Sequence, residues 1–224
     1  MMTDRRLTLS FLWPGRRSLR SLALVGALAC GVKLCPPPAS ATVAVRATVE
    51  SLTSQAQLVI LGRVTSQWSP KERGPQGQIY TRSAVEVSES WKGTAPGVIT
   101  VQQLGGTVDG FTLSVAGSPQ LTVGEEVVLF LTKGAGPEAM YHVLSLAQGV
   151  YHVSAPTLRS AGASGAIAPR VLSQDLSGIT LYQATPPSGP ASLKTHLIHN
   201  PAPAQSWTLS ALKAEVARLT KGAR

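Results

Sequence analysis

Cysteine is almost absent from this sequence. The two cysteines among 224 residues, Cys30 and Cys35, both lie within the first 41 residues. If that segment is removed, the rest of the chain contains no thiol, which excludes disulfide bonds, thiol catalysis and cysteine metal sites together. Aromatic residues (5%) and charged residues (14%) are also few, whereas hydrophobic residues reach 43%. A chain of this length and composition can be held together by its own apolar core.

Long hydrophobic runs are missing as well. The apolar run at residues 21–32, "SLALVGALACGV", extends over about 12 residues and is too short to cross a bilayer. It follows a basic segment, residues 1–20, and precedes "PPPASA", which ends with the small residues Ala39 and Ala41. This order predicts a signal peptide, residues 1–41, that is cleaved after Ala41. We therefore expect an exported protein, periplasmic or extracellular, with no integral membrane span in its mature chain.

Two details of this leader leave alternatives open. Cys30 ends the sequence "ALAC", which weakly resembles a lipoprotein signal, so a lipid anchor at Cys30 is the alternative to cleavage after Ala41. The arginine pairs in "DRRLTL" and "GRRSLR" resemble twin-arginine export signals without matching them fully. Both the general and the twin-arginine export routes are compatible with this leader.

Acidic residues are fewer than basic ones, and the formal net charge is +9. Residues 42–224 nevertheless carry 14 basic and 10 acidic side chains, a net charge of only +4. These charges are scattered, without the basic stripe and interleaved aromatic residues that binding to a phosphate backbone requires. We expect no nucleic-acid partner.

Motifs for catalysis are missing too. No serine occupies a G-x-S-x-G turn. Glu125 and Glu126 are adjacent in a predicted strand, so their carboxylates point to opposite faces and cannot act on one bond. His196 and His199 form H-x-x-H without a glutamate at the offset that zinc proteases use. The sequence predicts no catalytic residue, no cofactor and no metal site.

Strand-like segments dominate residues 42–155, which we expect to form one β-domain. The segment begins with a predicted short amphipathic helix near residues 43–55. Predicted strands follow at 58–68, 79–93, 98–104 and 125–132, and the segments 141–147 and 150–155 around Gln148-Gly149 resemble a hairpin. The first strand contains Gly62, a predicted bulge, and the apolar run at 125–132 is typical of a strand buried on both faces. Strands at this spacing favour a closed barrel or a sandwich.

The remaining chain has a different composition. Residues 156–205 are rich in Ala, Gly, Pro and Ser and are expected to be partly flexible, with one short strand in "SGITLYQA". Residues 206–224 are a predicted amphipathic helix, capped by Ser206 or Thr208, with a leucine and valine stripe that should dock on its own domain.

A family resemblance is carried by residues 56–132, with "AQLVILGRV", "IYTRSAVEVSESWKG", "VITVQQLGG" and "VGEEVVLFL" in that order. This order resembles the netrin-like domain, the OB-type barrel of the tissue inhibitors of metalloproteinases. It is similar also to exported bacterial proteins with a "KG…GG…GEEVLLFL" pattern. The resemblance implies a mainly β fold: an OB-like antiparallel barrel with a short N-terminal helix and a C-terminal amphipathic helix. Those inhibitors bind the protease zinc through an N-terminal cysteine, and this chain would begin at Thr42 instead.

Several segments are candidates for function. In "GGTVDG", Gly105 and Gly106 with Asp109 are either an anion-binding loop or a bend followed by a tight hairpin turn, and the alternating residues after it favour the turn. His142 and His152 would face each other across the predicted hairpin, without a third metal ligand nearby.

The few large aromatic residues are the best candidates for a binding face. We predict this face from Tyr80, Arg82 and Trp91, because OB-type barrels bind ligands across exposed strands. The alternative is that Trp68 and Trp91 close the ends of the barrel.

The function predicted from these observations is that of an exported, non-enzymatic binding protein whose partner is a protein or an envelope component. One alternative is an inhibitor or accessory factor of an extracellular protease that acts through a loop. A second alternative is a hydrolase with an unrecognised site around Asp109, His142 and His152.

Overall fold

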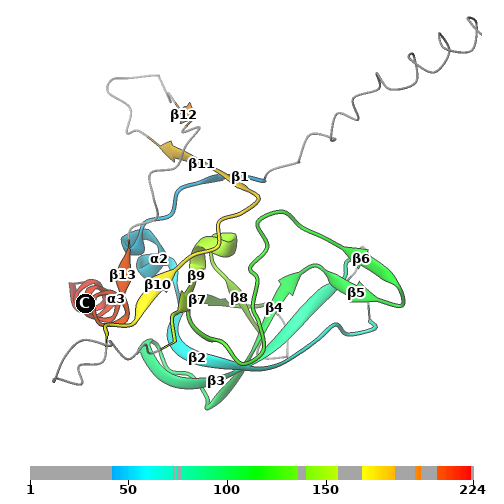
Figure 1. Ribbon diagram of the computed structural model, residues 1–224, viewed down its shortest axis with the longest axis horizontal. Coiled ribbons are helices and arrows are strands. Elements are labelled where there is room, and N and C mark those ends of the chain that lie inside the picture. The colour runs from blue at the N-terminus through cyan, green and yellow to red at the C-terminus, as the bar shows by residue number, and fades with distance from the viewer. Residues whose placement is uncertain are drawn as a thin grey trace, which may run out of the picture. The chain divides into compact units, whose positions relative to one another are not determined.

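The computed structural model describes residues 42–72, 74, 77–135, 140–155, 168–184, 195–197 and 206–222. All of these belong to the second of the two units into which the contacts divide the chain, Ala39–Arg224. This unit is mainly β, as predicted (Figure 1). The predicted signal peptide, with Ala39, Ala41 and Cys30, lies outside the described residues.

One large sheet contains most of the strands. In spatial order they are β13 (Trp207–Thr208), β10 (Val171–Ser173), β9 (Val150–Val153), β7 (Glu126–Lys133), β2 (Leu58–Trp68), β3 (Tyr80–Lys92), β4 (Val98–Leu104) and β8 (Met140–Val143). Strand β8 pairs in parallel with β4 and antiparallel with β7. Each of the five strands β7, β2, β3, β4 and β8 therefore pairs with the next one in this order, and the last, β8, pairs again with the first, β7.

Strand β7 separates two apolar clusters. Val127, Leu129 and Leu131 belong to one cluster, whereas Val128 and Phe130 belong to the other, and all five are fully buried. Side chains alternate across a strand, so a strand covered on both faces needs an unbroken apolar run. The predicted burial of this strand on both faces is confirmed.

The cluster that includes Phe130 is covered by two helices, α2 (Val49–Gln55) and α3 (Leu209–Gly222). Leu212 and Val216 of α3 are fully buried in this cluster, and Leu209 and Leu219 pack against it. The predicted C-terminal amphipathic helix and its docking on its own domain are confirmed. Figure 1 shows α2 and α3 side by side, and the two helices contact each other.

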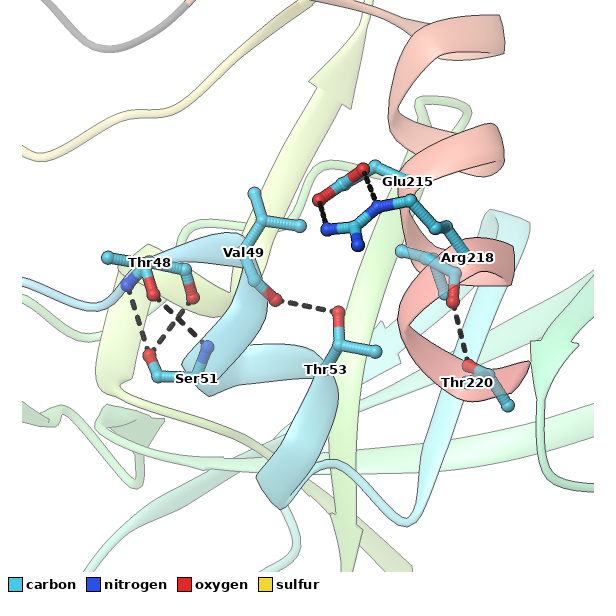
Figure 2. A network of polar contacts seen from close by, with 8 residues as sticks. Thr48, Val49, Ser51, Thr53, Glu215, Arg218 and Thr220 are labelled. Carbon is cyan, nitrogen blue, oxygen red and sulfur yellow. Dashed lines mark hydrogen bonds and ion pairs between the residues drawn. The ribbon is translucent and has the colours of Figure 1, made fainter. Parts of the chain in front are cut away.

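The predicted helix near residues 43–55 begins later than expected, so the prediction is wrong for the residues before Val49. Thr48 and Ser51 form a capping box, in which each side chain accepts a hydrogen bond from the other's backbone N–H, at 3.1 and 3.0 Å (Figure 2). A capping box fixes a helix start, so α2 begins at Val49. Residues Thr42–Val45 form strand β1 instead, paired in parallel with β11 (Ile179–Ala184).

The predicted hairpin around Gln148-Gly149 is also wrong. Strands β8 and β9 do not pair with each other; both pair with the same edge of β7, one after the other. The 3₁₀ turn Leu146–Gly149 between them is an insertion in one interrupted strand. Gln148 holds this insertion in place, because its side chain accepts a hydrogen bond from Ala47 N (2.8 Å) and donates one to Val45 O (3.1 Å).

The Ala/Gly/Pro/Ser-rich segment contributes strands where it is described. These are β10, β11 and β12 (Thr195–Leu197), and β11 includes the predicted strand "SGITLYQA". Leu172 of β10 is 4% exposed and packs in the cluster beneath the helices, and Leu181 of β11 is 2% exposed. A segment of mostly small residues therefore supplies two buried leucines.

Candidate binding site

A row of three side chains crosses the end of the sheet that is farthest from the helices. Trp68, the last residue of β2, lies opposite Arg82 of β3, and Arg82 lies opposite Gln102 of β4. Arg82 Nε donates a hydrogen bond to Gln102 Oε1 at 3.1 Å, which orients the guanidinium toward β4. The indole is 42% exposed. Tryptophan and arginine are the residues that most often contribute to the energy of protein interfaces.

Tyr80 extends this surface by one row. It lies two residues before Arg82 on β3 and opposite Leu104, which is 39% exposed. Its ring is in contact with the preceding loop: a Cβ atom on Gly74 would lie 2.7 Å from Tyr80 Cε2. We call the surface of Trp68, Tyr80, Arg82, Gln102 and Leu104 the outer face.

Trp91, the third residue of the predicted face, lies elsewhere. It is at the opposite end of β3 and packs against the cluster beneath the helices. Its indole N–H donates to Glu89 Oε2 at 2.8 Å, and the same carboxylate accepts a salt bridge from Lys213 of α3 at 2.7 Å. The hydrogen bonds from Lys213 and then from Trp91 lower the pKa of Glu89 below its usual value of 4.5. Trp91 therefore joins α3 to the sheet.

The inner side of the same strands becomes polar toward the end that carries the outer face. Val64, Val85, Ile99 and Val101 line the interior near the middle of β2, β3 and β4. One step further along the strands, the inward positions are Gln67, Ser83, Thr81 and Gln103. Ser83 is fully buried, and its hydroxyl accepts a hydrogen bond from Gln67 Nε2 at 3.0 Å. A cavity of about 270 Å³ opens beside these residues.

The segment "GGTVDG" forms the predicted bend and turn. Gly105 and Gly106 have φ angles of +110° and +135°, and a Cβ on Gly106 would lie 2.6 Å from Thr81 Oγ1. Strands β5 (Gly106–Val108) and β6 (Phe111–Leu113) follow as a hairpin. Asp109 and Gly110 connect them with φ angles of 51° and 79°, as a two-residue turn of type I′ requires. The prediction of a turn is confirmed.

The histidines discussed in the sequence analysis are separated by the interrupted strand. His142 pairs with Thr132 and His152 with Val127, which places them about 17 Å apart along β7. His142 Nδ1 lies 3.1 Å from Gln102 O, whereas His152 Nδ1 lies 3.0 Å from Glu125 Oε2. Among the described residues, no three His, Cys, Asp or Glu side chains gather closely enough to hold a metal ion.

The two adjacent glutamates have separate partners, as their opposite directions predict. Glu125 contacts His152, whereas Glu126 forms an ion pair with Arg170 and lies 3.9 Å from Arg63. His196 lies on β12, and His199 is outside the described residues.

Sequence reasoning missed Gln67 and Gln103, which face the interior beside the cavity. Gln103 could have been found from its parity, because it follows the buried residues Ile99 and Val101 at intervals of two. The sequence did not show that Gln103 lies beside a cavity, because the residues on the other side of that cavity come from distant segments of the chain.

The chain matches no known protein-family model, and a search of curated proteins finds none that is significantly similar to it. Within the part of the chain that the structure describes, no helix has the length and apolar character needed to cross a membrane.

Proposed function

We propose that this chain is an exported, non-enzymatic binding protein, and that its outer face contacts another protein or an envelope component. The observation that carries the proposal is the row of Trp68, Arg82 and Gln102 on three neighbouring strands, in which a partly exposed tryptophan lies opposite an arginine whose guanidinium is oriented by a hydrogen bond. An indole and a guanidinium held in place lose little conformational entropy on binding, which favours recognition.

We propose also that strands β2, β3, β4, β8 and β7 form an OB-type barrel of the netrin-like kind. The ring of pairings among these five strands supports this assignment, because an OB barrel is a five-stranded, partly open Greek-key barrel. The positions of α2 before the first of these strands and α3 after the last are in keeping with the resemblance to netrin-like domains. OB barrels bind their ligands across exposed strands, where the outer face lies.

Export by cleavage after Ala41 is the third part of the proposal, with a lipid anchor at Cys30 as its alternative. Strand β1 begins at Thr42, whose backbone N donates to Gly178 O at 3.0 Å and whose Oγ1 donates to Ala116 O at 2.6 Å. If the chain began at Thr42, the free amino group could still donate the hydrogen bond to Gly178 O, so cleavage after Ala41 is compatible with this strand. N-terminal sequencing of the protein recovered outside the cytoplasm should give Thr-Val-Ala.

The binding role is tested by replacing the outer face. The double variant Trp68→Ala, Arg82→Ala should lose the partner that the unchanged protein retains from an envelope extract, with its melting temperature nearly unchanged, because both side chains are partly exposed. Phe111→Ala, which removes a 64% exposed aromatic ring from β6, is the matched control and should retain the partner. Retention by the double variant would contradict the proposal, and so would a collapse of its stability, which would assign Trp68 to the core.

A further inference from the structure

A cavity of about 270 Å³ lies at the polar end of β2, β3 and β4. Gln67, Thr81 and Gln103 line it from the strands, and parts of the segment 112–121 complete its wall. Leu104 lines the cavity as well, and it belongs to the outer face, where it is 39% exposed. The cavity and the outer face therefore adjoin each other at Leu104.

The described wall of this cavity carries no charge, since none of its residues is Asp, Glu, Lys, Arg or His. By contrast, charged side chains line the cavity of about 360 Å³ beside α2 and α3, and also the one of about 390 Å³ beside Trp91. Moving a charged group out of water into a site without a counter-charge costs several kcal/mol, as a general rule. The cavity therefore favours an uncharged occupant.

Several polar groups of the wall are bonded to the chain itself. Thr81 Oγ1 donates to Gly105 O, and Ser118 Oγ donates to Leu104 O, both at 2.8 Å. Gln120 Nε2 donates to Ser118 O at 3.2 Å. These bonds hold part of the wall in place before a ligand binds, which lowers the entropy that binding costs.

Gln67 retains one atom for a ligand. Its Nε2 donates to Ser83 Oγ (3.0 Å) and to Leu121 O (2.7 Å), which uses both amide protons. Its Oε1 accepts no hydrogen bond from a described residue. In the described part of the chain, the buried side-chain atoms without a hydrogen bond are Gln103 Oε1 and Arg170 Nε, so Gln67 Oε1 is not buried. It is an accessible, open acceptor.

Gln103 offers the opposite kind of atom. Its Oε1 is enclosed by the protein and out of reach of a ligand. Its Nε2 donates to none of the described residues, and it too is absent from the buried atoms without a hydrogen bond. This nitrogen carries two protons, so the cavity has an open donor on β4 as well as an open acceptor on β2.

An uncharged group that both accepts and donates hydrogen bonds suits these two atoms. A carboxamide has one acceptor oxygen and two N–H donors. Its CH₂ stem can pack on the leucines of the wall, which are Leu104, Leu113 and Leu121. The volume of about 270 Å³ equals that of roughly nine water molecules, which admits one side chain and excludes a folded segment.

We propose that a protein partner bound to the outer face inserts one asparagine or glutamine side chain into this cavity, where its oxygen accepts a hydrogen bond from Gln103 Nε2. Gln67 Oε1 accepts from an N–H of the same inserted segment. A protein is favoured because Leu104 joins the cavity to a face of tryptophan and arginine, the residues that most often dominate protein interfaces. A partner at the outer face is part of the proposed function, on which this assignment rests.

Three small probes test the chemistry of the cavity without the partner. N-acetylglutamine N-methylamide carries the carboxamide, N-acetylglutamate N-methylamide has the same shape with a charge, and glucose is neutral without an amide. Each is titrated into the purified ¹⁵N-labelled protein and followed by NMR. We expect the glutamine probe to bind most tightly and to shift the signals of the Gln103 side-chain amide and the Gly106 backbone.

Two adjacent glutamines on opposite sides of β4 provide the matched variants. Gln103→Leu should weaken binding of the glutamine probe by about three- to tenfold, because the probe loses its donor. Gln102→Leu, whose side chain lies on the outer face, should leave the affinity for this probe unchanged. Equal affinity in Gln103→Leu and the unchanged protein would overturn the proposal. So would tighter binding of glucose or of the charged probe, or no binding of any probe.

The melting temperature separates a binding role from a structural one. Gln103→Leu should leave the melting temperature unchanged or raise it, since it removes a buried acceptor that has no donor among the described residues. The same variant should retain the envelope partner more weakly than the unchanged protein does. Full retention of the partner by Gln103→Leu would contradict insertion into the cavity.

Failure of this proposal is distinguishable from failure of the proposed function. The Trp68→Ala, Arg82→Ala variant should lose the partner and still bind the glutamine probe with unchanged affinity. If this double variant retains the partner, the outer face is not the binding surface and the proposed function fails. If it loses the partner while Gln103→Leu retains it fully, only the inserted carboxamide is ruled out.

Discussion

Trp91 and Trp68 lie at opposite ends of the same pair of strands, β2 and β3. At one end, α3 covers the sheet, and Trp91 packs against the apolar cluster with its N–H bonded to Glu89. At the other end, where Trp68 lies, the inward side chains are polar and the indole is 42% exposed. The same residue type is a structural link at one end and a surface feature at the other.

The difference comes from what each end is packed against. Leu212 and Val216 bring a continuous apolar stripe to the first end, and burial of such side chains is the main source of stability. The second end has glutamine, serine and threonine at the positions where the first has valine and leucine. One end of the unit is therefore packed beneath a helix, while the other carries the proposed binding face.

The largest expected effect is at the helix-covered end. Leu212→Ala should lower the free energy of unfolding by about 3 kcal/mol, because a fully buried leucine leaves both lost contacts and a cavity. Leu219→Ala, at a partly buried position on the same helix, is the control and should cost less. Urea unfolding monitored by circular dichroism measures both. If both variants lost the same small amount of unfolding free energy, α3 would not be part of the core.

The two tryptophans should differ in the same measurement. We expect Trp91→Ala to lower the free energy of unfolding by about 2 kcal/mol, because it removes a packed ring and the donor to Glu89. Trp68→Ala should change it by less than about 0.5 kcal/mol, as for other surface substitutions. Similar costs for the two variants would remove the distinction between the two ends.

The smallest expected effect depends on pH. Lys213 and Trp91 lower the pKa of Glu89 below 4.5, so the carboxylate stabilises the folded state above that pH and the contribution disappears as the pH falls below it. Because the side chain of Glu89 is 41% exposed, solvent screening keeps this contribution below about 1 kcal/mol. Glu89→Gln should be less stable than the unchanged protein at pH 7, and the difference should shrink as the pH falls below 4.5. A difference that stays constant as the solution is acidified would contradict the ion pair as its cause.

Several elements were predictable because their signals are local. The unbroken apolar run of β7, the alternation in β3 and the leucine stripe of α3 each specify which side of the element is buried. The Asp109-Gly110 step specifies its turn because few residues adopt positive φ at both positions. The start of α2 was mispredicted, although its signal was also local: the capping box at Thr48 marks the first turn, and the apolar spacing from Val45 concealed it.

The interrupted strand was mispredicted for a different reason. A Gln-Gly step between two strand-like segments is compatible with a hairpin, and only the partner strand decides whether the segments pair with each other or with β7. The separation of Trp91 from Tyr80 and Arg82 has a different, local origin: all three lie on one extended strand, and the eleven positions from Tyr80 to Trp91 place them at opposite ends of β3.

The amino-acid sequence by itself determined which segments extend, which coil and where the chain turns, because hydrophobic period and backbone preference act over a few residues. Which end of the strands is sealed by helices and which is left polar was decided only by tertiary structure. That choice depends on residues more than a hundred positions apart: Leu212 is buried in the same apolar cluster as Val59, and no local pattern in either segment specifies the other.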